Sequence, residues 1–232
     1  FGCGEYMIEK RSCGSPNFII NLQQCLELAL NNGKSIQEGT QRGPDYGNLI
    51  DYGNFHRLLS AYEQTVNYFL KAGAQAQYQI YEVTGQECPF SLISVLYDDC
   101  IKRGRSIFDG GIEFLGGTNE TYGNNNTADS LTAINELVYK KKQYSPKDLL
   151  HALKANWENK ESMQEDFKAA PKFGNDDDLA DNMVMHVHNN VCNNTSVAAK
   201  DTGLHHFRVV IINNNHNTLW GKHTSASPDG RK

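Results

Sequence analysis

The sequence contains no apolar run long enough to span a membrane, no signal-peptide pattern at its start and no block of basic residues. A membrane helix needs about 20 consecutive apolar residues, and nucleic acid attracts clustered lysine and arginine. The net charge of -5 also disfavours an anionic partner. We therefore expect neither a membrane protein nor a nucleic-acid-binding protein.

Paired cysteines are missing as well. The chain of 232 residues has six cysteines, and none of them forms a C-x-x-C pair or a zinc-finger spacing. A disulfide framework is not expected at this density in a chain of this length. The cysteine content therefore favours a reducing, cytoplasmic location.

Neither end has the pattern of a natural terminus. No initiator methionine precedes Phe1, and the last residues, Ser-Pro-Asp-Gly-Arg-Lys, have the composition of a turn around Asp229 and Gly230. We therefore expect a segment that is truncated at both ends.

Apolar residues recur at helical spacing in several stretches, and glycines at Gly33, Gly73 and Gly104 follow three of them. At Ser145-Pro146, serine has the position of an N-cap and proline that of the first helical residue. Helices are expected over about 19–31, 55–71, 90–103, 128–141 and 177–190, and from Ser145 onwards.

The rest of the chain is expected to contain loops and few strands. Residues 1–17 are interrupted by glycine and proline, and 104–127 is a Gly- and Asn-rich stretch whose few apolar residues indicate a packed loop or a short strand. The clearest strand is 207–212, which is rich in β-branched residues. Residues 74–84 could continue the second helix or begin a new one. This α/β mixture, mostly helical, suits part of an α/β barrel.

The candidate chemistry begins at Cys3-Gly4-Glu5. Residues i and i+2 of an extended segment point to the same side, so Cys3 and Glu5 would face one cavity. A carboxylate beside a thiol raises the thiol pKa, whereas a nucleophilic cysteine needs a positive neighbour. A neutral S–H group is instead the useful form if Cys3 exchanges a hydrogen atom. Glu5 could then accept and return a proton of the substrate.

The tripeptide alone also allows a simpler interpretation. Cys3 could be a small buried apolar residue, because cysteine is among the most buried residue types, and Glu5 could be a solvated acid. A thiol hydrolase that pairs Cys3 with a histidine is disfavoured by Glu5, which opposes the thiolate.

Several blocks of the chain, taken in order, decide between these interpretations. They are Gly2-Cys3-Gly4-Glu5, Gly14-Ser15-Pro16-Asn17, 89–104, Asp109-Gly110-Gly111, 128–134, 171–177 and 227–231. Together they resemble the glycyl radical enzymes of the pyruvate formate-lyase-like and glycerol dehydratase-like group over nearly the whole chain. The blocks at 171–177 and 227–231 are the most specific.

The resemblance implies a fold and a set of roles. The chain would be a partial pyruvate formate-lyase-like domain over 1–232, part of a ten-stranded α/β barrel, with 1–17 as the active-site cysteine loop. Cys3 would carry the transient thiyl radical and Glu5 would be the general acid and base. The implied function is an oxygen-sensitive lyase or dehydratase that abstracts hydrogen from a small polar metabolite to trigger C–C, C–O, C–N or C–S cleavage.

The resemblance also implies partners. A radical-SAM activating enzyme with an iron–sulfur cluster would install the glycyl radical, and the full-length protein would be a homodimer. The Arg-Val-x-Gly-Tyr type motif that carries this radical in the family does not occur in the 232 residues. We therefore expect this segment to bind no cofactor of its own and to be inactive alone.

The chain departs from the family at two places. True pyruvate formate-lyases have two adjacent cysteines, whereas Gly4 follows Cys3 here. The glycerol and propanediol dehydratases carry an aspartate at the position that matches Asn17, and asparagine cannot ionise. Asn17 is kept as a candidate substrate-binding residue. A formate acetyltransferase-type enzyme and a truncated, non-catalytic chain remain alternatives.

Other clusters have simpler explanations. His186, His188 and Cys192 are zinc-ligand types, but His186 would not share a helix face with the other two, so no metal is expected. The acidic run 176–178 is expected to begin a helix. The pair His205-His206 is expected to be partly exposed at a strand edge, with a substrate contact as the alternative.

Overall fold

The computed structural model describes residues 7–13, 17–212 and 215–232; the side chain of Asn17 is outside that description. The chain divides into two compact units. The first unit comprises 1–20, 69–121 and 191–212, and the second comprises 21–68, 122–190 and 213–232. The fold is therefore assembled from segments that are distant in sequence.

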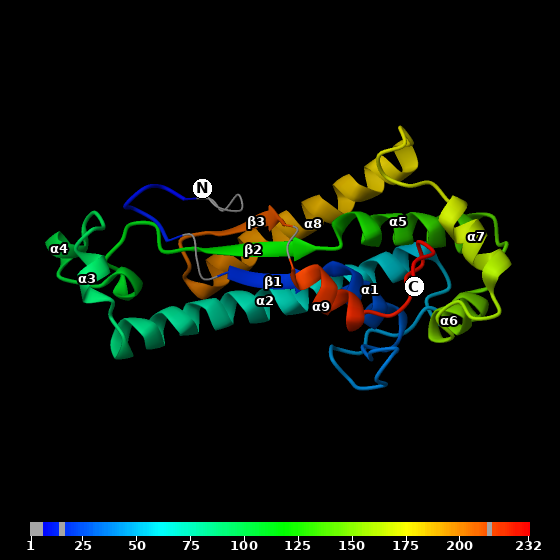
Figure 1. The fold of residues 1–232 in the computed structure, drawn as a ribbon, viewed down its shortest axis with the longest axis horizontal. Helices are drawn as coiled ribbons and strands as arrows, with labels where there is room; N and C mark the ends of the chain where they lie inside the picture. The colour runs from blue at the N-terminus through cyan, green and yellow to red at the C-terminus, as the bar shows by residue number, and fades with distance from the viewer. Residues whose placement is uncertain (1–6, 14–16, 213–214) are drawn as a thin grey trace. The chain divides into compact units, whose positions relative to one another are not determined.

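A three-stranded sheet forms the centre of the first unit (Figure 1). Its strands are β1 (Asn17–Asn21), β2 (Gly117–Tyr122) and β3 (Phe207–Ile211), in the order β1-β2-β3. β2 and β3 are parallel, with Gly117 opposite Phe207 and Thr121 opposite Ile211. The strand expected at 207–212 is therefore confirmed, and it pairs with a strand in the stretch where a packed loop or short strand was expected.

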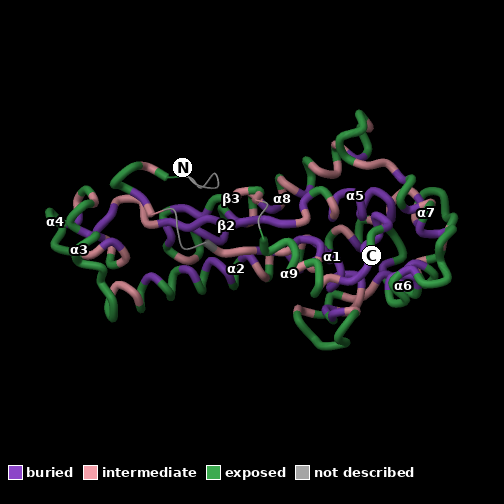
Figure 2. Tube along the Cα trace, viewed as in Figure 1, coloured by how far each residue is buried: buried purple, intermediate pink, exposed green. Residues whose placement is uncertain are grey.

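Two long helices supply the apolar layer against one face of this sheet. They are α2 (Phe55–Glu87) and α8 (Asp178–Thr202), and only the later part of each belongs to the first unit. Ala74 and Tyr81 of α2 pack with Ala198 of α8 and with Phe207 of β3 in one buried cluster. Every residue of β2 is buried, as the continuous purple along this strand shows (Figure 2). Burial on both faces is typical of a parallel strand inside an α/β fold.

The prediction of a helix over 19–31 is correct only from residue 22. Residues Asn17–Asn21 form β1, and α1 covers Leu22–Leu30. Phe18, Ile19 and Ile20 have aromatic and β-branched side chains that favour a strand. The side chain of Asn21 accepts a hydrogen bond from the backbone N–H of Gln24 at 3.1 Å and so begins the helix.

The second helix is longer than expected. α2 continues to Glu87, so 74–84 extends it and the end placed at residue 71 is wrong. Gly73 lies inside the helix because the ring of Phe18 packs directly over its backbone. A Cβ atom added at Gly73 would lie 2.7 Å from that ring. The glycine therefore marks a close approach of helix and strand, not a helix end.

The single helix expected over 90–103 is also wrong. The stretch contains two short helices, α3 (Ser91–Ser94) and α4 (Cys100–Arg103), separated by turns. Asp99 has a φ of 68°, a left-handed conformation that interrupts a continuous helix. Gly104 ends α4 with a φ of 63°, as expected. A 3₁₀ turn at Ile107–Asp109 leads on toward β2.

The second unit is helical. Besides α1 and the early parts of α2 and α8, it contains α5 (Asn124–Ile134), a π-helix (Asn135–Lys140), α6 (Pro146–Lys154), α7 (Glu161–Ala169) and α9 (His216–Lys222). The helix expected over 128–141 thus begins four residues earlier and changes hydrogen-bonding pattern at Asn135. The helix expected over 177–190 continues to Thr202. α7 and α9 were not expected.

The start of α6 is as expected. The Ser145 side chain accepts from the Asp148 backbone N–H at 3.1 Å, and the Asp148 side chain accepts from the Ser145 N–H at 3.2 Å. This capping box satisfies two backbone donors at once. Leu149, Leu153 and Trp157 are fully buried. The helix is therefore stabilised both at its end and along its apolar face.

Candidate functional site

Cys3 and Glu5 lie outside the described residues, and Asn17 is described only as the first residue of β1. Their roles therefore remain predictions. The structure does describe 7–13, which is part of the expected loop 1–17.

The segment 7–13 is held against the first unit by main-chain hydrogen bonds. The Asp98 N–H donates to the Lys10 carbonyl at 2.8 Å, and the Phe114 N–H donates to the Arg11 carbonyl at 3.0 Å. The Arg11 guanidinium forms an ion pair with Glu113 and lies 5.0 Å from the centroid of the Phe114 ring. Backbone hydrogen bonds and a cation–π contact together hold this part of the expected loop in place.

The histidine pair lies beside this anchor. The His205 N–H donates to the Leu115 carbonyl at 2.9 Å, and the His205 ring meets Phe114 edge-on with centroids 4.7 Å apart. His205 is exposed, but His206 is buried, so the expectation of two partly exposed rings is wrong for His206. The reason is Gly116, whose missing side chain leaves room for the His206 ring.

The environment of His206 keeps its ring neutral. Burial, followed by the nearby charges of His205 and Arg208, lowers the pKa of His206 from 6.5 to about 4. The Nδ1 atoms of His205 and His206 are 3.2 Å apart. Such a contact requires one ring nitrogen to donate a hydrogen bond and the other to accept it, so at least one of the two rings is neutral.

β2 carries buried polar side chains that the sequence analysis missed. Asn119 is fully buried, and its Nδ2 donates to the Thr195 hydroxyl of α8 at 3.1 Å. The Thr121 hydroxyl donates to the Val210 carbonyl at 3.3 Å. The Asn119 Oδ1 atom has no hydrogen-bond partner among the described residues. The sequence Gly-Thr-Asn-Glu-Thr-Tyr lacks the apolar residues that are typical of a buried strand. The burial of this strand is therefore seen only from its position in the sheet.

In the second unit, three of the blocks that carry the resemblance come together. The Phe173 N–H of block 171–177 donates to Asp129 Oδ1 of block 128–134 at 2.9 Å. Asn126, just before the latter block, donates to Asp229 Oδ2 of block 227–231 at 3.4 Å. Burial raises the pKa of Asp129, and the Phe173 N–H, Lys172 and Arg231 oppose that rise.

The turn expected at Asp229-Gly230 is present. The Gly230 N–H donates to the Ser227 carbonyl at 3.0 Å, and Gly230 has a φ of 94°. The buried Asp229 carboxylate accepts from the Ser227 hydroxyl and pairs with Arg231. The Gly230 carbonyl accepts from Gln164 Nε2 at 2.7 Å. This turn is therefore a fixed part of the second unit.

The remaining clusters have structural explanations. His186 Nε2 lies 2.7 Å from Glu63 Oε1, and Asp177 Oδ1 accepts from the Leu179 N–H at 2.9 Å at the start of α8. Within the described ranges, no three His, Cys, Asp or Glu side chains are grouped to hold a metal ion. None of the helices described is long and apolar enough to cross a bilayer.

Three of the described cysteines do not resemble nucleophiles. Burial raises the pKa of Cys25 to about 12 and also raises the pKa of Cys100 and Cys192. A thiol that stays protonated is a poor nucleophile at neutral pH. The surroundings of these three cysteines indicate packing, and Cys3 stays the predicted residue for chemistry.

Helices over one face of a sheet that contains a parallel strand pair define a segment of the α/β class. A family model described as pyruvate formate lyase-like matches residues 1–221. The chain therefore belongs to the pyruvate formate lyase-like family, as its sequence blocks predicted. The match begins at residue 1, so Cys3-Gly4-Glu5 lies inside it.

Individual relatives agree with this assignment. The chain is 30% identical over 215 residues to the (2S)-3-sulfopropanediol dehydratase of Klebsiella oxytoca, a match that covers 92% of the chain and 26% of that enzyme. The glycerol-bound B12-independent glycerol dehydratase of Clostridium butyricum matches with a TM-score of 0.91 and 28% identity over 100% of this chain and 29% of that one.

A glycyl radical enzyme from Archaeoglobus fulgidus also matches, with a TM-score of 0.90 and 26% identity, over 100% of this chain and 29% of that one. These structures confirm the expected segment of a glycyl radical enzyme barrel. The chain spans about a quarter of the length of the relatives that it matches.

Proposed function

We propose that the protein carrying this chain is a glycyl radical lyase or dehydratase acting on a small polar metabolite. The observation that carries the proposal is the Cys3-Gly4-Glu5 sequence inside a stretch that belongs to the pyruvate formate lyase-like family. The relatives named above include dehydratases of sulfopropanediol and of glycerol. From these relatives we infer that the substrate has a hydroxylated carbon beside the bond that is broken.

Cys3 acts as a hydrogen-atom carrier in this proposal. Its sulfur radical takes a hydrogen atom from a substrate C–H group, so that an S–H bond forms, a C–H bond breaks and a carbon radical remains. After the leaving group departs, the same S–H bond returns its hydrogen atom to the product radical. The thiol begins and ends each turnover in the same state.

Glu5 handles the proton that accompanies this exchange. The loss of a hydrogen atom beside a hydroxyl group acidifies the O–H, and a carboxylate two residues from the thiol in the sequence can accept that proton. Glu5 then protonates the leaving group. Because the carboxylate also opposes thiolate formation, it keeps Cys3 in the protonated form that a hydrogen-atom carrier needs.

The initial radical must come from elsewhere, because a thiol does not lose a hydrogen atom unaided. A glycyl radical outside these 232 residues, installed by a radical-SAM activating enzyme, supplies the oxidising equivalent when present. Asn17 is a candidate to bind the substrate through its neutral amide. A dry site would protect the radical from side reactions.

Replacement of Cys3 tests the proposal. In the protein that carries this chain, Cys3→Ser should abolish turnover, while electron paramagnetic resonance after activation should still detect the glycyl radical. Cys88→Ser is the matched control, since Cys88 is an exposed free thiol and should leave turnover unchanged. Turnover by the Cys3→Ser protein would contradict the proposed role.

Replacement of Glu5 tests the proton step separately. Glu5→Gln keeps the size of the side chain and removes its ability to accept a proton. Loss of a general acid–base group costs about 10²- to 10⁴-fold in rate. We expect kcat to fall within that range while the radical yield is unchanged. An unchanged kcat would exclude Glu5 from the proton transfer.

A further inference from the structure

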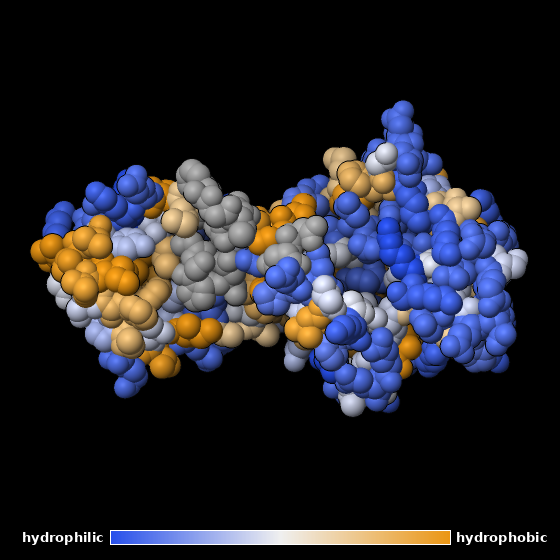
Figure 3. Space-filling model, in the orientation of Figure 1, coloured by the Kyte–Doolittle hydropathy of each residue, from blue (hydrophilic) through white to orange (hydrophobic). Residues whose placement is uncertain are grey.

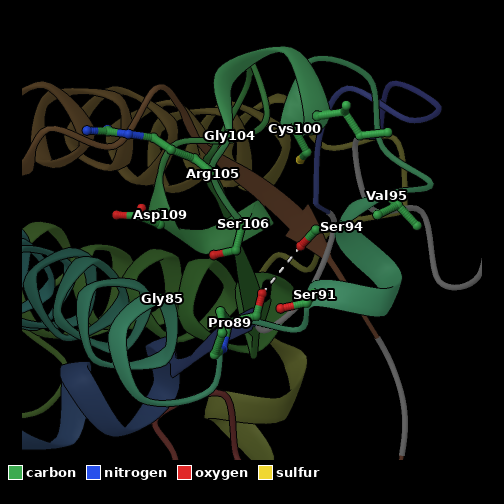
Figure 4. A pocket seen from close by; sticks show the side chains of 11 residues that line it. Gly85, Pro89, Ser91, Ser94, Val95, Cys100, Gly104, Arg105, Ser106 and Asp109 are labelled. Atoms are coloured by element: carbon green, nitrogen blue, oxygen red, sulfur yellow. Dashed lines mark hydrogen bonds between the residues drawn. The ribbon is translucent and has the colours of Figure 1, made fainter.

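A pocket of about 390 Å³ opens in the first unit, where the end of α2 meets α3, α4 and the 3₁₀ turn (Figure 4). Pockets that hold small molecules usually have volumes of about 300–1,000 Å³. The pocket is at the lower end of this range, so its size suits a small metabolite.

The walls of this pocket are held by close contacts of the main chain. The Gly111 N–H donates to the Ser106 carbonyl at 2.8 Å, and a Cβ atom added at Gly111 would collide with the Arg105 carbonyl oxygen. The Ser94 hydroxyl accepts from the Ile107 N–H at 3.1 Å and so ties α3 to the 3₁₀ turn. These contacts make the pocket a preformed part of the fold.

The pocket is lined by one basic and one acidic side chain, Arg105 and Asp109. Both residues are exposed, and neither side chain forms a hydrogen bond or an ion pair within the described ranges. The Arg105 guanidinium lies beside the residue that follows Asp109, since a Cβ atom added at Gly110 would be 3.5 Å from its Nη1 atom. In Figure 4 both side chains extend to the same side of the pocket. A ligand with both signs of charge can therefore contact both groups at once.

The remaining lining groups include an unsatisfied hydroxyl and an apolar wall. The Ser106 Oγ atom is buried and has no hydrogen-bond partner among the described residues. A buried hydroxyl in that state is costly, so a polar ligand group that reaches it is favoured. Val95 and Ile101 also line the pocket, and the surface over α3 and α4 is apolar in Figure 3. An aliphatic group of the ligand is therefore favoured beside the charged ones.

The two charges disfavour a ligand that carries only one sign of charge. An anion would be repelled by Asp109, and a cation would be repelled by Arg105. A zwitterion has its carboxylate paired with the guanidinium, in the bidentate geometry that arginine offers, and its ammonium group paired with the carboxylate of Asp109. The aliphatic α-amino acids combine these two charges with an apolar side chain.

We propose that this pocket binds a small aliphatic α-amino acid as its zwitterion, with the ligand carboxylate on Arg105 and the ligand ammonium group on Asp109. The Ser106 hydroxyl donates to the ligand carboxylate, and the ligand side chain lies against Val95 and Ile101. The site binds its ligand without reacting with it. The inference does not depend on the radical chemistry, so either can fail without the other.

Isothermal titration of L-leucine into the protein that carries this chain tests the proposal. A dissociation constant on the order of 1 mM or tighter is expected. Isoamylamine lacks the carboxylate of L-leucine, and isocaproic acid lacks its ammonium group. Each should bind at least about 10-fold more weakly than L-leucine, because each leaves one charged group of the pocket unpaired. Absence of L-leucine binding, or binding of either analogue as tightly as L-leucine, would overturn the proposal.

Substitutions in the pocket locate the site. Arg105→Gln and Asp109→Asn should each raise the dissociation constant of L-leucine about 10- to 100-fold, the loss expected for a charged hydrogen bond. Arg57→Gln, at an exposed arginine of α2 in the second unit, is the matched control and should leave the constant unchanged. If both pocket variants bind L-leucine as the wild type does, the ligand binds elsewhere and the proposal is wrong. If a variant does not fold, the comparison of L-leucine with its two analogues still decides.

Discussion

His206 lies at the start of β3 with its ring against the backbone of Gly116, where no side chain could fit beside it. Its neutral form is favoured first by burial and then by the charges of His205 and Arg208. In an unfolded chain the same imidazole would be protonated below about pH 6.5. The folded protein therefore binds fewer protons at this residue than the unfolded chain does in mildly acidic solution.

This difference gives the stability a pH dependence with a definite sign. The folded pKa of about 4 lies below the unfolded value of 6.5, so the contribution of His206 is fully present above pH 6.5 and is lost as the pH falls toward 4. Because of His206, we expect the free energy of unfolding to be about 2 kcal/mol lower at pH 5 than at pH 7.5.

Urea denaturation at the two pH values measures this effect. His206→Gln should remove this difference in the free energy of unfolding between the two pH values. His205→Gln, at the exposed neighbour, should retain most of the difference. An identical pH dependence in the wild type and His206→Gln would show that the ring does not titrate as its burial implies.

At the scale of the element, α2 shows how a neighbouring strand decides whether a helix continues. Glycine inside a helix lowers the stability of the helix by about 1 kcal/mol relative to alanine, so Gly73 is expected to end a helix. The helix nevertheless continues for fourteen residues beyond it, to Glu87. The contact of Phe18 with the bare backbone at Gly73 compensates for the poor helix propensity.

Alanine substitution separates propensity from packing. Gly73→Ala should destabilise the protein by about 1–3 kcal/mol, because overpacking forces the Phe18 ring to move. Gly221→Ala is the matched control: Gly221 lies in α9 with nothing within 4 Å of its added Cβ, so the change should be neutral or stabilising by up to about 1 kcal/mol.

Thermal or urea denaturation of both variants provides the comparison. Replacing Phe18 by leucine in the Gly73→Ala background should recover part of the loss, since the smaller side chain makes room for the new methyl group. A Gly73→Ala protein as stable as the wild type would show that the helix–strand contact is not tight.

At the scale of the whole molecule, neither unit is continuous in sequence. The first unit draws on 1–20, 69–121 and 191–212, and both α2 and α8 begin in one unit and end in the other. Contacts between such distant segments cost loop-closure entropy before they contribute stability. We infer that the fold forms as an assembly of the entire chain.

The proposed radical chemistry requires more than these 232 residues. No Arg-Val-x-Gly-Tyr type motif occurs in the 232 residues. The isolated chain, incubated anaerobically with a radical-SAM activating enzyme and its reductant, should therefore give no glycyl radical signal in electron paramagnetic resonance. A protein that contains both this chain and such a motif is the positive control. A glycyl radical on the isolated chain would contradict the proposed division of roles.

Local signals in the sequence were sufficient where a feature depends on neighbouring residues. The capping box at Ser145 and Asp148, the end of α4 at Gly104 and the turn at Asp229-Gly230 were all predictable, because each is determined by the backbone preferences of a few consecutive residues. The family was predictable for a related reason, since ordered blocks along the chain are a property of the sequence itself.

The tertiary structure alone decided the features that depend on distant partners. β2 is recognised as a buried strand of polar residues only from its place between β1 and β3, and the Thr195 hydroxyl of α8 accepts a hydrogen bond from the buried Asn119. Gly73 continues a helix because Phe18 lies over it, and His206 is neutral because Gly116 makes room for it. Burial and long-range contacts act between residues far apart in the chain, so they leave no local pattern from which they could be predicted.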